Sequence, residues 1–123
     1  MRFTVVLVAG LMLASPVLAE DYEKGPNGGL MLDVAGIDAE LMTSGTKVTI
    51  NVFDANKPTP LPTKGYTAAV LIVTGKARET VALASSGDNS LTGEAKVAIA
   101  PDATITLTIR TAEGKSGQVK FKK

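Results

Sequence analysis

Apolar residues alternate with polar residues in one segment of the chain after another, and this period of two limits the possible folds more than any other feature. Leu30, Leu32 and Val34 alternate with Met31 and Asp33. Side chains of a strand point to opposite faces in turn, so the pattern predicts strands that bury one face. It returns in the segments 37–41, 48–52, 78–84, 91–99, 104–111 and 118–122, while the nearly continuous apolar run at 66–74 predicts a central strand covered on both faces or partly shielded by a loop. Helical spacing with capping residues is absent, so we predict an all-β fold.

Turn residues separate these segments at short intervals. Ala35-Gly36 and Ser44-Gly45 stand where two hairpins would turn. Short strands joined by turns are typical of a sandwich or a barrel, and the roughly 100 residues that follow segment 1–19 favour an immunoglobulin-like β-sandwich of about seven to eight antiparallel strands. The prolines of segment 55–64 remove backbone donors, which predicts a loop, one that crosses between sheets.

The N-terminus has the features of a signal peptide. Arg2 gives a basic start, an apolar run covers 3–13, and Val17-Leu18-Ala19 supplies small residues for cleavage. The run is shorter than the roughly 20 residues of a bilayer span, which favours a signal peptide over a retained anchor. We predict cleavage after Ala19 and export to the bacterial periplasm, with no membrane span after signal removal. The predicted division is a signal peptide at 1–19, an extended N-terminal segment at 20–29 and a β-sandwich domain at 30–123.

The residue types present exclude several kinds of chemistry. The sequence has no Cys and no His, which removes the common ligands of zinc and copper(II), the Ser-His-Asp triad and the cysteine nucleophile. A Gly-rich phosphate loop is absent from the sequence. The net charge is +1, and the basic stripe with aromatic residues that nucleic acid requires is missing. We therefore predict a protein that is not an enzyme, needs no cofactor and does not bind nucleic acid.

A soft metal-ion site is one hypothesis for the outward face of the first predicted hairpin. The candidate ligands are Met31, Asp33, Asp38, Glu40 and Met42. A two-residue turn at Ala35-Gly36 places Asp33 opposite Asp38, and carboxylates that face each other across a ladder repel. A bound cation relieves this repulsion, and the nearby thioethers favour copper(I) or silver. The alternative is that the methionines pack under a loop or a second sheet while the acids are solvated.

Several segments resemble a known group of proteins. They are Gly25-Pro-Asn-Gly-Gly-Leu30, Ile37-Asp-Ala-Glu-Leu41, the turn 85–93 and Val119-Lys-Phe121. Together they resemble small exported periplasmic β-sandwich proteins of Gram-negative bacteria, related to the N-terminal extension of heavy-metal efflux adaptor proteins, the membrane fusion proteins. The resemblance implies a periplasmic β-sandwich and a link to metal stress.

Two classes of function follow from these features. The first is a non-enzymatic accessory or binding module, associated with heavy-metal efflux, that binds an envelope protein partner through an exposed strand edge or face. The second is a carrier of a soft cation, copper(I) or silver, on the methionine and carboxylate face. A carrier is stabilised by metal in isolation, because any ligand of the native state raises stability by mass action. A partner-binding module does not respond to metal.

Overall fold

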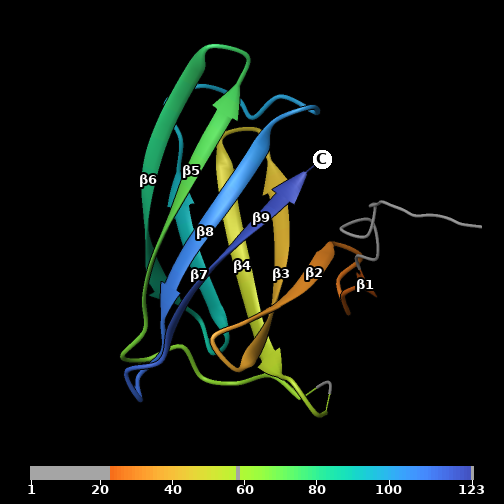
Figure 1. The fold of residues 1–123 in the computed structure, drawn as a ribbon, viewed down its shortest axis with the longest axis vertical. Helices are drawn as coiled ribbons and strands as arrows, with labels where there is room; N and C mark the ends of the chain where they lie inside the picture. Colours follow the sequence, from red (N-terminus) through yellow and green to blue (C-terminus); the bar gives the residue numbers. More distant parts are fainter. Residues whose placement is uncertain (1–22, 58, 123) are drawn as a thin grey trace, which may run out of the picture.

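A computed structural model describes residues 23–57 and 59–122. All regular secondary structure in this part of the chain is β-strand (Figure 1). The strands are β1 (Glu23–Lys24), β2 (Leu30–Val34), β3 (Ile37–Ser44), β4 (Lys47–Asp54), β5 (Thr67–Thr74), β6 (Ala77–Ser86), β7 (Ser90–Glu94), β8 (Thr104–Arg110) and β9 (Ser116–Lys122). The all-β prediction is confirmed. The predicted signal peptide 1–19 and its cleavage after Ala19 lie outside the described residues.

The strands form one curled sheet with the order β1-β2-β3-β4-β7-β6-β5-β8-β9, and every pairing is antiparallel. β6 belongs to both halves of this sheet, because residues 77–83 pair with β5 and residues 84–86 pair with β7. In Figure 1 the half that holds β5, β8 and β9 lies over the half that holds β3, β4 and β7. The sheet curls so far that β2 contacts β9. One pairing order thus connects all nine strands through β6, and the immunoglobulin-like arrangement of two sheets stays a prediction.

An aliphatic core fills the space between the two halves. Its largest members with almost no exposed surface are Val48, Ile50, Val52, Val70, Leu91, Ile105, Leu107, Ile109 and Phe121. They occupy alternate positions of β4, β5, β7, β8 and β9, as the period of two predicts. Full burial of such a side chain contributes about 1.5–3 kcal/mol. The described part of the chain has no disulfide, so this core carries most of the stability.

The first hairpin has the predicted turn and register. Ala35 has a φ of 53° and Gly36 a φ of 82°, which is the conformation of a two-residue type I′ turn. Asp33 pairs with Asp38, and Met31 pairs with Glu40. The outward face of β2 and β3 therefore carries the side chains that the sequence places there.

The strand predicted at 91–99 is shorter in the structure, because β7 ends at Glu94. The chain then leaves the sheet and packs against the turn between β3 and β4. The amide of Ala95 donates to the Thr46 carbonyl (2.8 Å), and the amide of Ile99 donates to the Gly45 carbonyl (2.9 Å). These bonds satisfy the backbone without a neighbouring strand, so the apolar residues of this segment form a loop.

The proline-rich loop crosses from β4 in one half of the sheet to β5 in the other, as predicted. The amide of Leu61 donates to the Val52 carbonyl (3.0 Å). The hydroxyl of Thr63, which is fully buried, lies 2.7 Å from the Ser85 hydroxyl and donates to the Ser90 carbonyl (3.0 Å). The loop is therefore fixed to the outer side of β4 and to the end of β6.

Candidate binding site

Glu40 is fully buried, although it belongs to the outward face of β3. Its Oε2 accepts hydrogen bonds from the amides of Asn27 (2.8 Å) and Gly29 (2.9 Å). Its Oε1 accepts from the side-chain amides of Asn27 (2.9 Å) and Asn51 (3.4 Å). All four partners are donors, so both carboxyl oxygens of Glu40 act as acceptors. Glu40 is thus an anchor for the segment that covers it.

That segment is residues 23–29, called the N-terminal strap here. β1 is extended and pairs with β2, but Gly25–Gly29 forms a turn in place of the extended chain predicted for 20–29. The amide of Gly25 donates to the Gly29 carbonyl (2.8 Å), and the amide of Gly28 donates to the Gly25 carbonyl (2.9 Å). The carboxylate of Glu40 provides the acceptors that draw the chain into this turn.

Two strap glycines are required by close approach to β3. A Cβ atom at Gly25 would overlap the Glu40 side chain, and one at Gly29 would overlap the Leu41 carbonyl and approach the Met42 sulfur to 2.6 Å. The Gly25-Pro-Asn-Gly-Gly29 sequence is therefore explained by the wrapping of a buried carboxylate.

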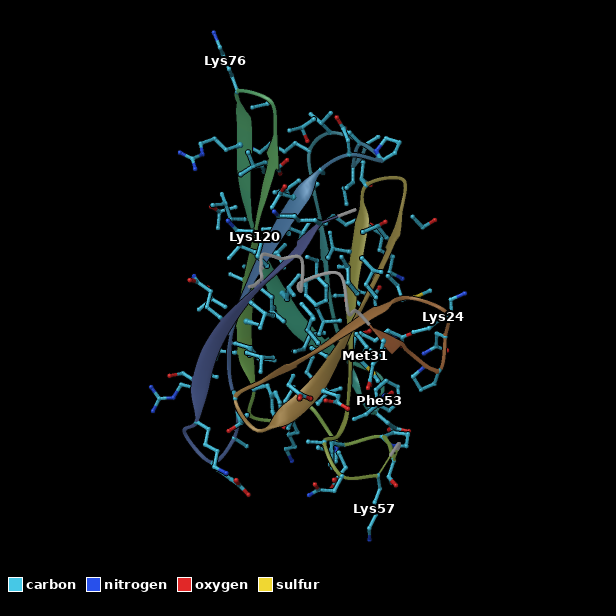
Figure 2. The ribbon with its side chains drawn as sticks, turned by 45° about the vertical axis from the view of Figure 1, so that its right-hand side comes forward. Lys24, Met31, Phe53, Lys57, Lys76 and Lys120 are labelled. Atoms are coloured by element: carbon cyan, nitrogen blue, oxygen red, sulfur yellow. The ribbon has the colours of Figure 1, made fainter. Side chains whose placement is uncertain are left out.

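An acidic cleft of about 330 Å³ lies between the strap and the loop that follows β4. Met31 and Phe53 form its apolar floor, and Figure 2 shows these two side chains near each other on the same side of the molecule. Phe53 is 4% exposed, and its main chain forms an antiparallel bridge with Pro60 of the proline-rich loop. The complete lining is Glu23, Lys24, Gly25, Pro26, Met31, Asp38, Phe53, Asp54, Ala55, Asn56 and Lys57. A hollow of about 240 Å³ shares several of these residues and adds Asp33.

The surroundings of Asp38 disfavour its ionisation. Burial, the largest cause, and a hydrogen bond with the Asp33 side chain together help to raise the pKa of Asp38 from 3.8 to about 7. The charges of Asp33, Glu23 and Asp54 act in the same direction. Like charges close together favour a shared proton over two ionised groups. Near neutral pH, the Asp38 carboxyl therefore holds its proton for about half of the time.

The cations beside the cleft do not neutralise it. Lys24 and Lys57 belong to its two walls, but Figure 2 shows their side chains extending away from Met31 and Phe53. Neither lysine forms an ion pair with a described residue. The cleft thus combines an apolar floor with unpaired negative charge, which suits a ligand that carries a positive charge on an apolar body.

The five predicted metal ligands are only partly brought together. Met31, Asp33 and Asp38 share the hollow beside the cleft. Glu40 is enclosed by the strap, and Met42 lines a separate hollow with Gly28 and Gly29. Among residues 23–57 and 59–122, no group of three or more acidic side chains is placed to hold a metal ion.

The cleft also contains residues that the sequence reasoning did not select, namely Glu23, Phe53 and Asp54. Glu23 belongs to β1 and the other two to the end of β4, so they come from two segments that are far apart in the sequence. The glycines of the strap are the one sequence signal that indicates a close approach of this kind.

Comparisons with known protein families, with curated proteins and with solved structures found no match for this chain. The resemblance to exported Gram-negative proteins and efflux adaptors therefore stays a prediction from the sequence. In the described residues, no helix is long and apolar enough to cross a membrane. The function must be inferred from the geometry and the charges of the cleft.

Proposed function

We propose that the chain is a non-enzymatic binding module of the bacterial periplasm, exported by residues 1–19, that binds a protein partner through the acidic cleft. The observation that carries this proposal is the lining of the cleft. Unpaired carboxylates surround an apolar floor in a hollow of about 330 Å³. That volume is at the lower end of the range of roughly 300–1,000 Å³ for ligand sites, which favours a single side chain over a large metabolite.

A lysine or arginine side chain of the partner is the occupant that this lining fits. The aliphatic part of such a side chain lies on Met31 and Phe53, while its charged end reaches Asp33 and Asp38. Charge-assisted hydrogen bonds to carboxylates are the strongest of their kind in proteins. The cation displaces the proton of Asp38, so binding becomes tighter as the pH rises through about 7.

A titration with N-acetyl-arginine methylamide tests the proposal on the exported chain purified from the periplasm. We expect NMR shifts at the Met31 methyl group and the Asp38 amide, with binding about tenfold weaker at about pH 6 than at about pH 8. The uncharged citrulline analogue should give no shifts. Asp38→Asn should weaken binding, while Asp102→Asn, at an exposed acid outside the cleft, should leave it unchanged. Equal responses to the two analogues would refute the proposal.

Binding of a soft cation is a second candidate, because the Met31 thioether shares a hollow with the Asp33 and Asp38 carboxylates. Thioether ligands select copper(I) or silver over hard cations, and such binding would support the link to heavy-metal efflux. Thermal unfolding with silver and with calcium tests it. We expect only silver to raise Tm, with the rise lost in Met31→Leu and kept in Met42→Leu, since Met42 lies outside this hollow. The same Tm with and without silver would exclude this candidate.

A further inference from the structure

The first half of β6 has a neighbouring strand on one side only. Residues 77–83 pair with β5, and the pairing with β7 begins at Ala84. β7 approaches β6 at Ala82, where a Cβ atom placed on Gly93 would lie 2.7 Å from the Ala82 carbonyl oxygen. Beyond that point β7 turns away into the loop that follows it. Arg78–Thr80 is therefore a strand edge without a partner strand in the described structure.

The backbone groups at this edge point away from the sheet. Gly75 (φ 60°) and Lys76 form a two-residue turn, so the flanking pair Thr74 and Ala77 exchanges both hydrogen bonds. Pairs of this kind alternate along a ladder, so Arg78 and Thr80 direct their N–H and C=O groups away from β5. Both residues are exposed, and neither main chain is bonded to another described strand.

An apolar groove of about 310 Å³ runs beside this edge. It lies between β6 and the loop after β7, whose Val97 is 71% exposed. The lining is Ile72, Thr74, Ala77, Arg78, Glu79, Val97, Ala98, Ile99 and Ala100. The Glu79 carboxylate accepts a hydrogen bond from the Lys96 amide (2.8 Å), which holds the loop at this distance from the strand.

The charges around the edge are mainly basic. Arg78 and Lys96 are exposed, and Lys76 extends from the tip of the β5–β6 hairpin, far from Met31 and Phe53 in Figure 2. Glu79 is engaged with the Lys96 amide. A segment that lies along this edge is therefore favoured when it is acidic, because opposite charges on paired strands attract.

We propose that the Arg78–Thr80 edge binds an extended segment of a partner protein by strand addition. Main-chain hydrogen bonds to Arg78 and Thr80 supply affinity, and the groove supplies specificity. The partner residue opposite Glu79 points to the groove side, so it is aliphatic. The residues before and after it point to the outer face beside Arg78, so they are acidic. This second site goes beyond the acidic cleft and does not depend on it.

A seven-residue peptide of alternating glutamate and valine is the probe, and the same peptide with lysine in place of glutamate is its control. We expect the glutamate peptide to slow hydrogen exchange of the Arg78 and Thr80 amides in the exported chain. Thr80→Pro removes one outward N–H without breaking the pairing with β5 and should weaken binding roughly tenfold. Thr80→Val keeps the N–H and should bind normally.

Charge reversal gives a test that does not depend on the proline variant folding. Arg78→Glu lies at an exposed position, and it should reverse the preference from the glutamate peptide to the lysine peptide. Asp38→Asn alters the acidic cleft and should leave peptide binding unchanged, which separates this site from the proposed function. Unchanged exchange at Arg78 and Thr80 with saturating peptide, or protection that rises with protein concentration alone, overturns the proposal. The second outcome means that another copy of the chain covers the edge.

Discussion

Replacement of Glu40 by alanine should detach the N-terminal strap. The Glu40 carboxylate is fully buried and accepts four hydrogen bonds. Three of them come from Asn27 and Gly29. Without this acceptor, the strap amides face an apolar side chain, and an unsatisfied buried donor costs about 1–3 kcal/mol. The free energy is then lower when the strap leaves β3 and its amides form hydrogen bonds with water.

The detachment limits how much stability is lost. Hydrogen bonds to a charged group contribute about 1.5–3 kcal/mol each, so four of them set a nominal upper bound near 6–12 kcal/mol. Asn27 is exposed and Gly29 is half-buried, so both donors reach water once the strap leaves β3. The loss of stability is then limited to the free energy that holds the strap in place. We expect a loss of about 2–4 kcal/mol for Glu40→Ala. Glu40→Gln keeps the volume and one acceptor oxygen, so its loss should be about 1–2 kcal/mol.

Urea unfolding at neutral pH measures these losses, and limited proteolysis shows whether the strap is released. We expect new cleavage within residues 23–29 of Glu40→Ala while the remainder of the chain stays resistant. Glu94→Ala is the matched control, because Glu94 is exposed and accepts one hydrogen bond from the Thr46 hydroxyl (2.7 Å). Its loss should stay below about 0.5 kcal/mol. A loss under about 1 kcal/mol for Glu40→Ala, or a strap that still resists the protease, would show that Glu40 is not the anchor.

Three further predictions concern the cleft, the strap and the proline-rich loop. The pKa of Asp38 is about 7 in the fold and 3.8 ordinarily, so the folded chain binds the extra proton between these values and stability falls as the pH rises from about 4 to about 7. Asp38→Asn should make stability less dependent on pH and raise the free energy of unfolding by about 1–2 kcal/mol at about pH 8, a value reduced for solvent screening. Urea unfolding at about pH 5 and about pH 8 measures this difference. Gly29→Ala places a Cβ atom against the β3 main chain and should lower Tm more than Gly28→Ala. A Cβ atom at Gly28 meets no atom within 4 Å, and its only cost is the strain of a φ of +86°. Equal decreases in Tm would contradict the close approach of Gly29 to β3. Thr63→Val removes a buried hydroxyl that bonds the Ser90 carbonyl, so unfolding should show a loss of about 1–3 kcal/mol, against almost none for Thr59→Val at an exposed position.

The strands and the first hairpin were predictable because their signals are local. The register that pairs Asp33 with Asp38 follows once Ala35-Gly36 is recognised as a two-residue turn, since alternation then fixes every later pair. The inward residues of β4 and β8 follow from the same period of two. Their burial needs no knowledge of which strands become neighbours.

The enclosure of Glu40 was not predictable from that pattern. Alternation places Glu40 on the outward face, which is correct, but the pattern does not indicate that the strap covers that face. Phe53 is likewise buried on the outward face of β4, at the point where the chain at Pro60 pairs with it. Both cases depend on an irregular segment folding back onto a strand, and irregular segments have no period to detect.

The end of β7 and the open edge of β6 share another cause. The residues after Glu94 are apolar, so they suggest a longer strand, yet hydrogen bonds to Gly45 and Thr46 hold them in a loop. Because the chain leaves the sheet after Glu94, β7 does not continue beside the first half of β6. Sequence periodicity contains no information about strand neighbours, so the edge at Arg78 becomes visible only in three dimensions.

The contact between β2 and β9 has a consequence for the order in which the chain folds. These strands come from opposite ends of the described chain, and a Cβ atom at Gly117 would lie 2.9 Å from the Val34 side chain. Closure of the core must therefore wait for the last strand, whose Phe121 is fully buried. Contacts so distant along the chain slow folding to roughly milliseconds to seconds. If the chain is exported as proposed, this late closure keeps the polypeptide unfolded until β9 has been synthesised. An unfolded polypeptide can still pass through a translocation channel.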